Sequence, residues 1–178
     1  MNVSVREMKK DDIESIIDYF VNADSEFLKS MGADKSKLPD RVEWIKKLNQ
    51  EFKKPYTDKE FYYIIWLLDD TPIGHSNINN IEFGNTATMH LHVWKNAKRK
   101  KGLGLELLKK TIPFYFKNFK LEKLICEPYS ENIAPNKTLI RAGFEFIKKY
   151  ETVPGWINFL QYVNSYELTK DQFERLKL

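Results

Sequence analysis

Residues 86–116 have the sequence TATMHLHVWKNAKRKKGLGLELLKKTIPFYF, and the rest of the chain can be placed around this stretch. Residues 86–94 alternate in the manner of a strand, and apolar side chains recur with helical spacing from Leu103 onward. Between them lies a basic turn that ends in Gly102 and Gly104. The stretch therefore predicts a strand, a cationic glycine turn and the beginning of a helix.

The turn has the properties of an anion site. The first N–H groups of a helix have no partner inside the helix, so they point outward with partial positive charge. Glycines let an anion approach that backbone, and Arg99, Lys100 and Lys101 add positive potential. A phosphate or pyrophosphate would fit here. The same residues would equally suit a tight turn without a ligand, so the choice depends on the rest of the chain.

Composition narrows the class of protein. A length of 178 residues predicts a single domain over residues 1–178, and 14% aromatic residues indicate a packed protein. The net charge of +4 arises from mixed acidic and basic residues, so we expect no nucleic-acid partner. No apolar run is long enough to cross a bilayer, and Cys126 is the only cysteine. We therefore expect no membrane partner, no internal disulfide and a cytoplasmic location.

The predicted elements follow the order strand, two helices, three strands, helix, strand, helix and two strands. Their expected ranges are 2–6, 13–21, 40–52, 59–68, 72–81, 86–94, 103–117, 121–127, 132–142, 144–152 and 159–168. Residues 22–38 predict a loop or short helix, and Pro113 should kink its helix or shift its register. Strands 86–94 and 121–127 should be parallel because a helix connects them.

Three motifs in this order resemble the GNAT acyltransferase family over nearly the whole chain. Residues 99–104, RKKGLG, match the family's Arg/Gln-x-x-Gly-x-Gly/Ala pyrophosphate motif. Asn132 and the Gly143-Phe144 pair match its Asn…Gly-Phe block. Glu127 stands five residues before Asn132, where the similar ribosomal-protein alanine and serine N-acetyltransferases keep a general base. The resemblance implies an α+β fold with a mixed, mostly antiparallel central sheet flanked by helices and splayed between residues 86–94 and 121–127.

The resemblance also implies an acetyl-CoA-dependent N-acetyltransferase, in which a deprotonated primary amine attacks the acetyl thioester directly. Backbone groups of one strand would hold the pantetheine arm, the glycine turn would hold the pyrophosphate, and asparagines of the next helix would assist. The residues implied for these roles are His92, Val93 and Trp94, then Arg99, Lys100, Lys101, Gly102, Leu103, Gly104 and Leu105, and finally Asn132 and Asn136.

Catalytic groups are expected near the same strands. Glu127 could take a proton from the ammonium, or it could be an ordinary solvated carboxylate. His92 shares a strand face with His90 and could act as a base, although packed histidines are more common there. The family's usual thiolate acid, a Tyr seven residues after the Asn, is Leu139 here. No metal site is expected. A water, another residue or no dedicated acid would then serve the thiolate, and the candidate residues are Tyr129, Ser130 and Tyr150.

The sequence leaves the amine acceptor open between a protein N-terminus and a small amine of the aminoglycoside or polyamine type. A polycation would be favoured if acidic residues converged on the acceptor cleft; those available are Asp24, Glu26, Glu82 and Glu131. The aromatic segment 154–159 could close over an acceptor or form a homodimer interface.

Two readings from other classes compete with an enzyme. Leu139 keeps open a degenerate module that binds acyl-CoA without turnover. A nucleotide binder is disfavoured because the glycine turn lacks a Gly-Lys-Ser/Thr ending and the third glycine of a dinucleotide motif.

Overall fold

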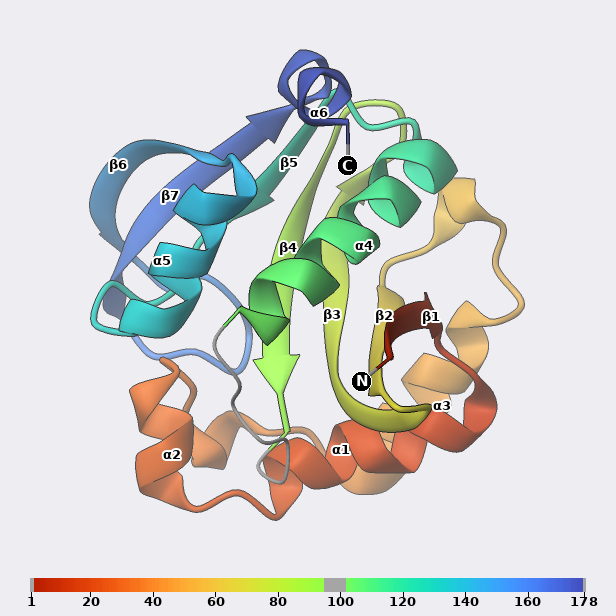
Figure 1. Ribbon diagram of the computed structural model, residues 1–178. Helices are drawn as coiled ribbons and strands as arrows, with labels where there is room; N and C mark the ends of the chain where they lie inside the picture. The colour runs from red at the N-terminus through yellow and green to blue at the C-terminus, as the bar shows by residue number, and fades with distance from the viewer. Residues whose placement is uncertain (1, 95–101, 178) are drawn as a thin grey trace.

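The computed structural model describes residues 2–94 and 102–177, and it shows one seven-stranded sheet with helices packed on it (Figure 1). The strand order is β1-β2-β3-β4-β5-β7-β6. The strands are β1 (Val3–Glu7), β2 (Tyr62–Leu68), β3 (Thr71–Glu82), β4 (Thr86–Val93), β5 (Lys123–Cys126), β6 (Glu145–Thr152) and β7 (Gln161–Thr169). The helices are α1 (Ile13–Val21), α2 (Ser25–Ser30), α3 (Arg41–Glu51), α4 (Leu103–Phe119), α5 (Ile133–Ala142) and α6 (Lys170–Leu176).

The junction of β4 and β5 is the feature that positions the site. These strands run parallel, as predicted, whereas the other neighbouring pairs of described strands are antiparallel. Their pairing joins only Thr86–Thr88 to Lys123–Ile125. Beyond Thr88 the two strands separate, as Figure 1 shows below the first turn of α4. The predicted splay is therefore present, and it leaves one edge of β4 without a strand partner.

Alternation along β2 divides the core into two layers. Tyr62, Ile64 and Trp66 belong to the cluster packed against α4, whereas Tyr63 and Ile65 belong to the cluster packed against α1, α2 and α3. Successive side chains of a strand point to opposite faces, so a strand buried on both faces is apolar at nearly every position. The sheet therefore separates α4 from the three N-terminal helices.

Helix α4 is fixed to the sheet by buried polar contacts as well as by apolar packing. The Trp66 indole Nε1 donates to Thr111 Oγ1 at 2.8 Å, and the Tyr115 hydroxyl donates to Ser76 Oγ at 2.8 Å. The helix continues through Pro113 to Phe119, so the proline does not end it. These contacts hold the first turn of α4 beside the open edge of β4.

One short helix lies where the prediction allowed it, and one helix was not predicted. Helix α2 lies within residues 22–38, where a loop or short helix is predicted, and the Asp24 carboxylate accepts from the backbone N–H of Phe27 at its start. Helix α6 is missing from the prediction because it follows β7 without an intervening loop. Its sequence signal is the capping box of Thr169 and Gln172, whose side chains bond each other's backbone N–H groups.

Candidate active site

A cavity of about 610 Å³ opens where β4 and β5 separate. One part, the gap side, is lined by residues of β4, the first turn of α4, the end of β5 and the start of α5. The other part, the aromatic chamber, lies under the N-terminal helices. The gap side comprises Leu91, Val93, Gly102, Leu103, Gly104, Leu105, Glu127, Tyr129 and Asn132. The aromatic chamber comprises Tyr19, Phe20, Phe27, Trp44, Tyr63, His75, His92 and Trp156.

The open edge of β4 presents backbone groups to the gap side. The Trp94 N–H donates to the Ile73 carbonyl of β3 at 2.9 Å. Backbone directions alternate along a strand, so His92 also turns its backbone groups to β3, and Leu91 and Val93 turn theirs to the gap. The resemblance implied that the backbones of His92 and Trp94 hold the pantetheine arm. In the structure these two backbones face β3 instead of the gap. Leu91, which lines the cavity, was not among the predicted residues, although the alternation along the strand places its backbone towards the gap.

The glycine turn leaves open space in front of α4. Gly102 precedes the helix with a left-handed φ of 92°. A Cβ added at Gly102 or Gly104 would meet no heavy atom within 4 Å. An anion could therefore reach the backbone N–H groups of the first turn. The predicted cations Arg99, Lys100 and Lys101 lie outside the described residues.

The two predicted asparagines of α5 have different surroundings. Asn132 lines the cavity at the start of the helix. Asn136 is buried, and its Nδ2 donates to the backbone carbonyls of Tyr129 and Asn132 at 3.0 and 2.7 Å. Its Oδ1 accepts from Asn164 Nδ2 and the Tyr166 hydroxyl. These internal bonds tie α5 to β7, so Asn136 shapes the loop that carries Asn132 and does not itself line the cavity.

Glu127 stands at the end of β5 and lines the cavity. The Tyr150 hydroxyl of β6 donates to its Oε1 at 2.7 Å. Burial and the nearby carboxylate raise the pKa of Tyr150 to about 12, so this hydroxyl keeps its proton at neutral pH. Tyr129 and Ser130 are the other hydroxyl candidates for the thiolate acid. Tyr129 lines the cavity, and the Ser130 hydroxyl donates a hydrogen bond to Glu131. Leu139 is fully buried in the core and offers no polar group.

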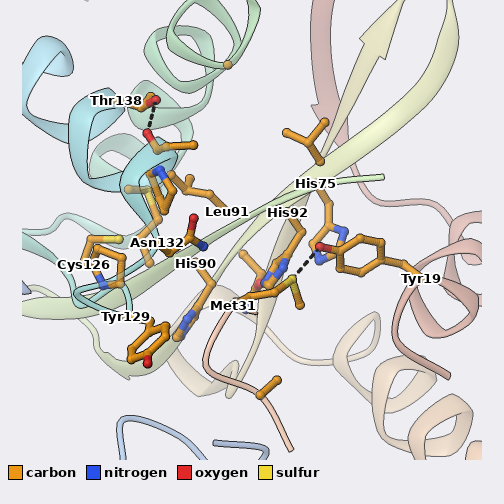
Figure 2. Close-up of a pocket in the computed structure, with 18 of the residues that line it drawn as sticks. Tyr19, Met31, His75, His90, Leu91, His92, Cys126, Tyr129, Asn132 and Thr138 are labelled. Carbon is orange, nitrogen blue, oxygen red and sulfur yellow. Dashed lines mark hydrogen bonds between the residues drawn. The ribbon is translucent and has the colours of Figure 1, made fainter. Parts of the chain in front are cut away.

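Three histidines lie on the chamber face of β3 and β4, and His75 was not singled out from the sequence. His75 lies opposite His92 in the strand register, with ring centroids 4.7 Å apart. The Trp94 indole Nε1 donates to His75 Nδ1 at 3.0 Å, and His90 Nε2 lies 3.0 Å from Asn79 Oδ1. Figure 2 shows His75 and His92 beside Tyr19, on the opposite side of the cavity from Tyr129 and Asn132.

The histidines are neutral at pH 7. Burial lowers the pKa of His75 to about 3 and that of His90 to about 4. The pKa of His92 is lowered well below its ordinary value, mainly by burial and to a smaller extent by the neighbouring imidazoles of His75 and His90. Charging any of these rings would require an ion to form away from water. The ring of His92 therefore lines the chamber as a neutral group.

The acidic residues that could have marked a polycation site do not line the cavity. Among the described lining residues, Glu127 is the one carboxylate. Asp24 caps α2, and Glu82 accepts a hydrogen bond from Asn85 in the β3–β4 turn. Glu131 lies near Lys149 at the surface. The condition that would have favoured a polycation, acidic side chains converging on the acceptor cleft, is therefore not met by the described lining.

The segment between β6 and β7 closes one side of the chamber. Trp156 lines the cavity and packs edge-on against Trp44 at a centroid distance of 5.9 Å. The backbone N–H of Asp34 donates to the Ile157 carbonyl at 2.8 Å. Asn158 Nδ2 donates to the Gly32 carbonyl at 2.8 Å. The aromatic segment thus contacts the region around α2 and forms a wall.

Residues 2–94 and 102–177 contain neither a metal-binding cluster nor a membrane-spanning helix. In this part of the chain no group of three or more His, Cys, Asp and Glu side chains could hold a metal ion. No helix there has the length and apolar character needed to span a bilayer.

Comparison with known proteins gives the family. Residues 2–145 match the family described as an acetyltransferase (GNAT) domain, and no curated protein matches the sequence. The fold is similar to spermidine N-acetyltransferase from Vibrio cholerae in complex with CoA and spermine, at TM-score 0.77 and 15% identity over 97% of this chain and 98% of that one. It is also similar to a ribosomal-protein-S5-alanine acetyltransferase from Vibrio fischeri, at TM-score 0.76 and 18% identity over 97% and 96%.

A third similar structure is an aminoglycoside acetyltransferase in complex with coenzyme A, at TM-score 0.73 and 17% identity over 99% of this chain and 100% of that one. These likenesses show the shared fold. The family match confirms the predicted fold, the predicted N-acetyltransferase class and acetyl-CoA as co-substrate, and this chain belongs to the GNAT acetyltransferase family.

Proposed function

We propose that this protein binds acetyl-CoA in the gap between β4 and β5 and transfers the acetyl group to a primary amine held in the aromatic chamber. One observation carries the proposal. The open edge of β4, the open first turn of α4 and the carboxylate of Glu127 all line the same cavity. Each of the three suits a different part of the reaction.

The gap side supplies the cofactor groups. The pantetheine arm contains amides, so it can pair with the free backbone groups of Leu91 and Val93 as an added strand would. The pyrophosphate would lie at the first turn of α4, where Gly102 and Gly104 leave room for it. Asn132 lines the path between these two positions. The cationic residues 99–101 belong to the same proposed site through their place in the motif.

Glu127 is the base that we propose for the amine. It would accept a proton from the ammonium, directly or through water, and Tyr150 would hold its carboxylate in place. The amine nitrogen then bonds to the thioester carbon, the C–S bond breaks and CoA leaves as the thiolate. The nitrogen releases its second proton as the amide forms, and this proton passes through water to the thiolate. Backbone N–H groups at the gap would stabilise the charge that develops on the carbonyl oxygen. His92 is a weak base in its buried setting, so we place it in the acceptor wall.

A buried cysteine and an edge strand bear on location and assembly. Cys126 is a buried free thiol, which suits a reducing compartment, and we propose the cytoplasm. The segment 154–159, which could have formed a dimer interface, packs against the region around α2, so we propose that a homodimer would use β6, an edge strand on which Phe146 and Ile147 are half exposed.

The proposal is tested by titrating the purified protein with acetyl-CoA in a calorimeter, with ATP and NAD as controls, and then measuring amine-dependent thiol release. Specific binding of acetyl-CoA together with release of CoA by an amine would support it. Binding without release for every amine tried would show an acyl-CoA-binding module without turnover. Absence of acetyl-CoA binding at millimolar concentration would overturn the cofactor site.

A further inference from the structure

None of the described residues that make up the aromatic chamber has a side chain that is ionised at pH 7. These residues contribute six aromatic rings and two neutral imidazoles, and the neutral polar side chains of Ser30, Asn77 and Asn158 also line the cavity. A polyamine or an aminoglycoside carries several ammonium groups, and each would lose its hydration here without gaining a carboxylate partner. Cation–π contacts with the rings would recover only part of that loss. The chamber therefore favours an acceptor that carries no charge beyond the reacting amine.

His75 shows which polar group the chamber can hold. An indole N–H can only donate, so the bond from Trp94 Nε1 makes His75 Nδ1 the acceptor. A neutral imidazole has one proton, which must then be on Nε2. His75 Nε2 is buried and has no hydrogen-bond partner in the described part of the chain. It is a donor without an acceptor, which repels an ammonium and suits an oxygen.

His92 places a second polar atom beside this donor. Its Nδ1 is also buried and without a partner among the described residues, and its ring lies 4.7 Å from that of His75. A hydroxyl oxygen could accept from His75 and donate to His92, and a carbonyl oxygen could accept from His75. Figure 2 shows that this pair lies across the cavity from Tyr129 and Asn132. The oxygen would therefore be held at the end of the chamber remote from the gap.

The walls of the chamber also limit the size of the acceptor. Ala33 and Asn158 form an antiparallel bridge, and Gln161 Nε2 donates to the Gly32 carbonyl at 2.7 Å. A Cβ on Gly32 would lie 2.1 Å from Gln161 Oε1, so the two segments meet closely. The cavity of about 610 Å³ must hold the acetyl end of the cofactor as well as the amine. A small molecule fits these limits better than an extended protein N-terminus.

We propose that the acceptor is a small primary amine with an uncharged, aromatic or apolar body and a neutral oxygen that meets His75 and His92. The assignment rests on the proposed function, since it names the acceptor class of that reaction. The reacting amine would lie near Glu127 and the oxygen near the two imidazoles, with the body against the rings of the chamber.

A panel of amines tests the acceptor class with two separate readings. The probes are 3- and 4-hydroxyphenethylamine, phenethylamine, spermidine and a short peptide with an N-terminal alanine. Binding of each probe to the CoA-saturated protein is measured by calorimetry, and kcat/KM is measured by CoA release from acetyl-CoA. We expect at least one hydroxylated amine to give the highest value in both readings, with phenethylamine about 10-fold lower because it leaves the buried donor unpaired.

Variants at His75 test the polar contact. His75→Phe keeps a ring but removes the donor, so the preference for the hydroxylated amine over phenethylamine should disappear. His75→Gln keeps a donor at a similar reach and should retain part of the preference. Tyr162→Phe, an exposed hydroxyl deletion on β7, is the matched control and should leave the preference unchanged.

The outcomes separate this inference from the proposed function. A hydroxylated amine that binds but is not acetylated would support the chamber and overturn the proposed reaction. Turnover with spermidine or the peptide as the best acceptor would support the reaction and overturn the inference. Equal values for the hydroxylated and unsubstituted amines in the wild type, or no binding of any aromatic amine at millimolar concentration, would also overturn the inference, whether or not the variants fold.

Discussion

The two sides of the cavity are built in different ways. The gap side presents backbone from short contiguous stretches, chiefly the end of β4 and residues 102–105. The aromatic chamber presents side chains from α1, α2, α3, three strands and the segment between β6 and β7. Backbone groups can bind a cofactor whatever the neighbouring side chains are, whereas a side-chain chamber changes with each substitution. Cofactor binding on the gap side therefore depends little on side-chain identity, whereas the shape and polarity of the chamber depend on its individual side chains.

Glu127 stands where the two sides meet, and its replacement should have the largest effect. Glu127→Gln keeps the shape of the side chain but removes the base, so kcat at pH 7 should fall by about 10²- to 10⁴-fold. The loss should shrink towards pH 10, because a growing fraction of the amine is then deprotonated in solution. Acetyl-CoA binding should be unchanged. The measurement is kcat at saturating acetyl-CoA over this pH range, together with the Kd for acetyl-CoA.

Tyr150→Phe is the control for this prediction. It removes the hydrogen bond to Glu127 and keeps the carboxylate, so the loss in kcat should be smaller, about 10-fold. If Glu127→Gln turned over at the wild-type rate at pH 7, Glu127 would not be the base.

A pair of glycines tests whether the gap side binds through open backbone. Gly102 and Gly84 both have left-handed φ values, 92° and 78°, and a Cβ at either would meet nothing within 4 Å. Alanine at each should therefore cost about 1–2 kcal/mol of unfolding free energy through backbone strain. Only Gly102→Ala should also weaken acetyl-CoA, about 10-fold, because its Cβ enters the space proposed for the pyrophosphate.

Gly104→Ala distinguishes the effect of filling the pyrophosphate space with a Cβ from the effect of backbone strain. Its surroundings are equally open and its φ is not left-handed, so stability should hold while the Kd for acetyl-CoA rises. Chemical denaturation and calorimetry give the two quantities. An equal loss of affinity in Gly84→Ala and Gly102→Ala would mean that strain, rather than the site, explains the effect.

The same contrast explains how much could be predicted from the sequence. The fold and the gap side follow from local patterns, because a strand, a glycine turn and a helix occupy residues 86–116 without interruption. The chamber depends on contacts such as that of Gly32 with Gln161, which are 129 positions apart, and no local pattern contains them. His75 was missed for this reason, since its importance comes from Trp94 and His92 on a different strand.

On the gap side, the expectation for Asn136 differed from the structure because it depended on contacts with another strand. Helical spacing places Asn136 on the same face as Asn132, but two of the four hydrogen bonds of its buried amide come from Asn164 and Tyr166 of β7. The sequence gives no indication of that partner strand's register. A sequence motif thus locates a site made of backbone groups, but it does not determine which nearby side chains face that site.

The smallest of the predicted effects is a loss of unfolding free energy at acidic pH, which arises from His75 in the chamber. His75 is neutral in the folded protein down to a pKa of about 3, whereas in the unfolded chain it takes up a proton below its ordinary pKa of about 6.5. The unfolded state therefore binds more protons between these values, and stability falls as the pH falls. The stabilisation is complete above pH 6.5, and His75 alone should remove about 1 kcal/mol between pH 6 and pH 5.

The slope of unfolding free energy against pH measures this effect by denaturant titration. His75→Phe should flatten the slope, because the variant has no imidazole to charge at that position, even if the unpaired Trp94 indole lowers stability at every pH. Gly84→Ala is the matched control, since it should lower stability without altering the slope. An unchanged slope in His75→Phe would mean that this histidine already takes up its proton in the folded protein. The chamber would then hold a cation, and an acceptor with an anionic group would be the better candidate.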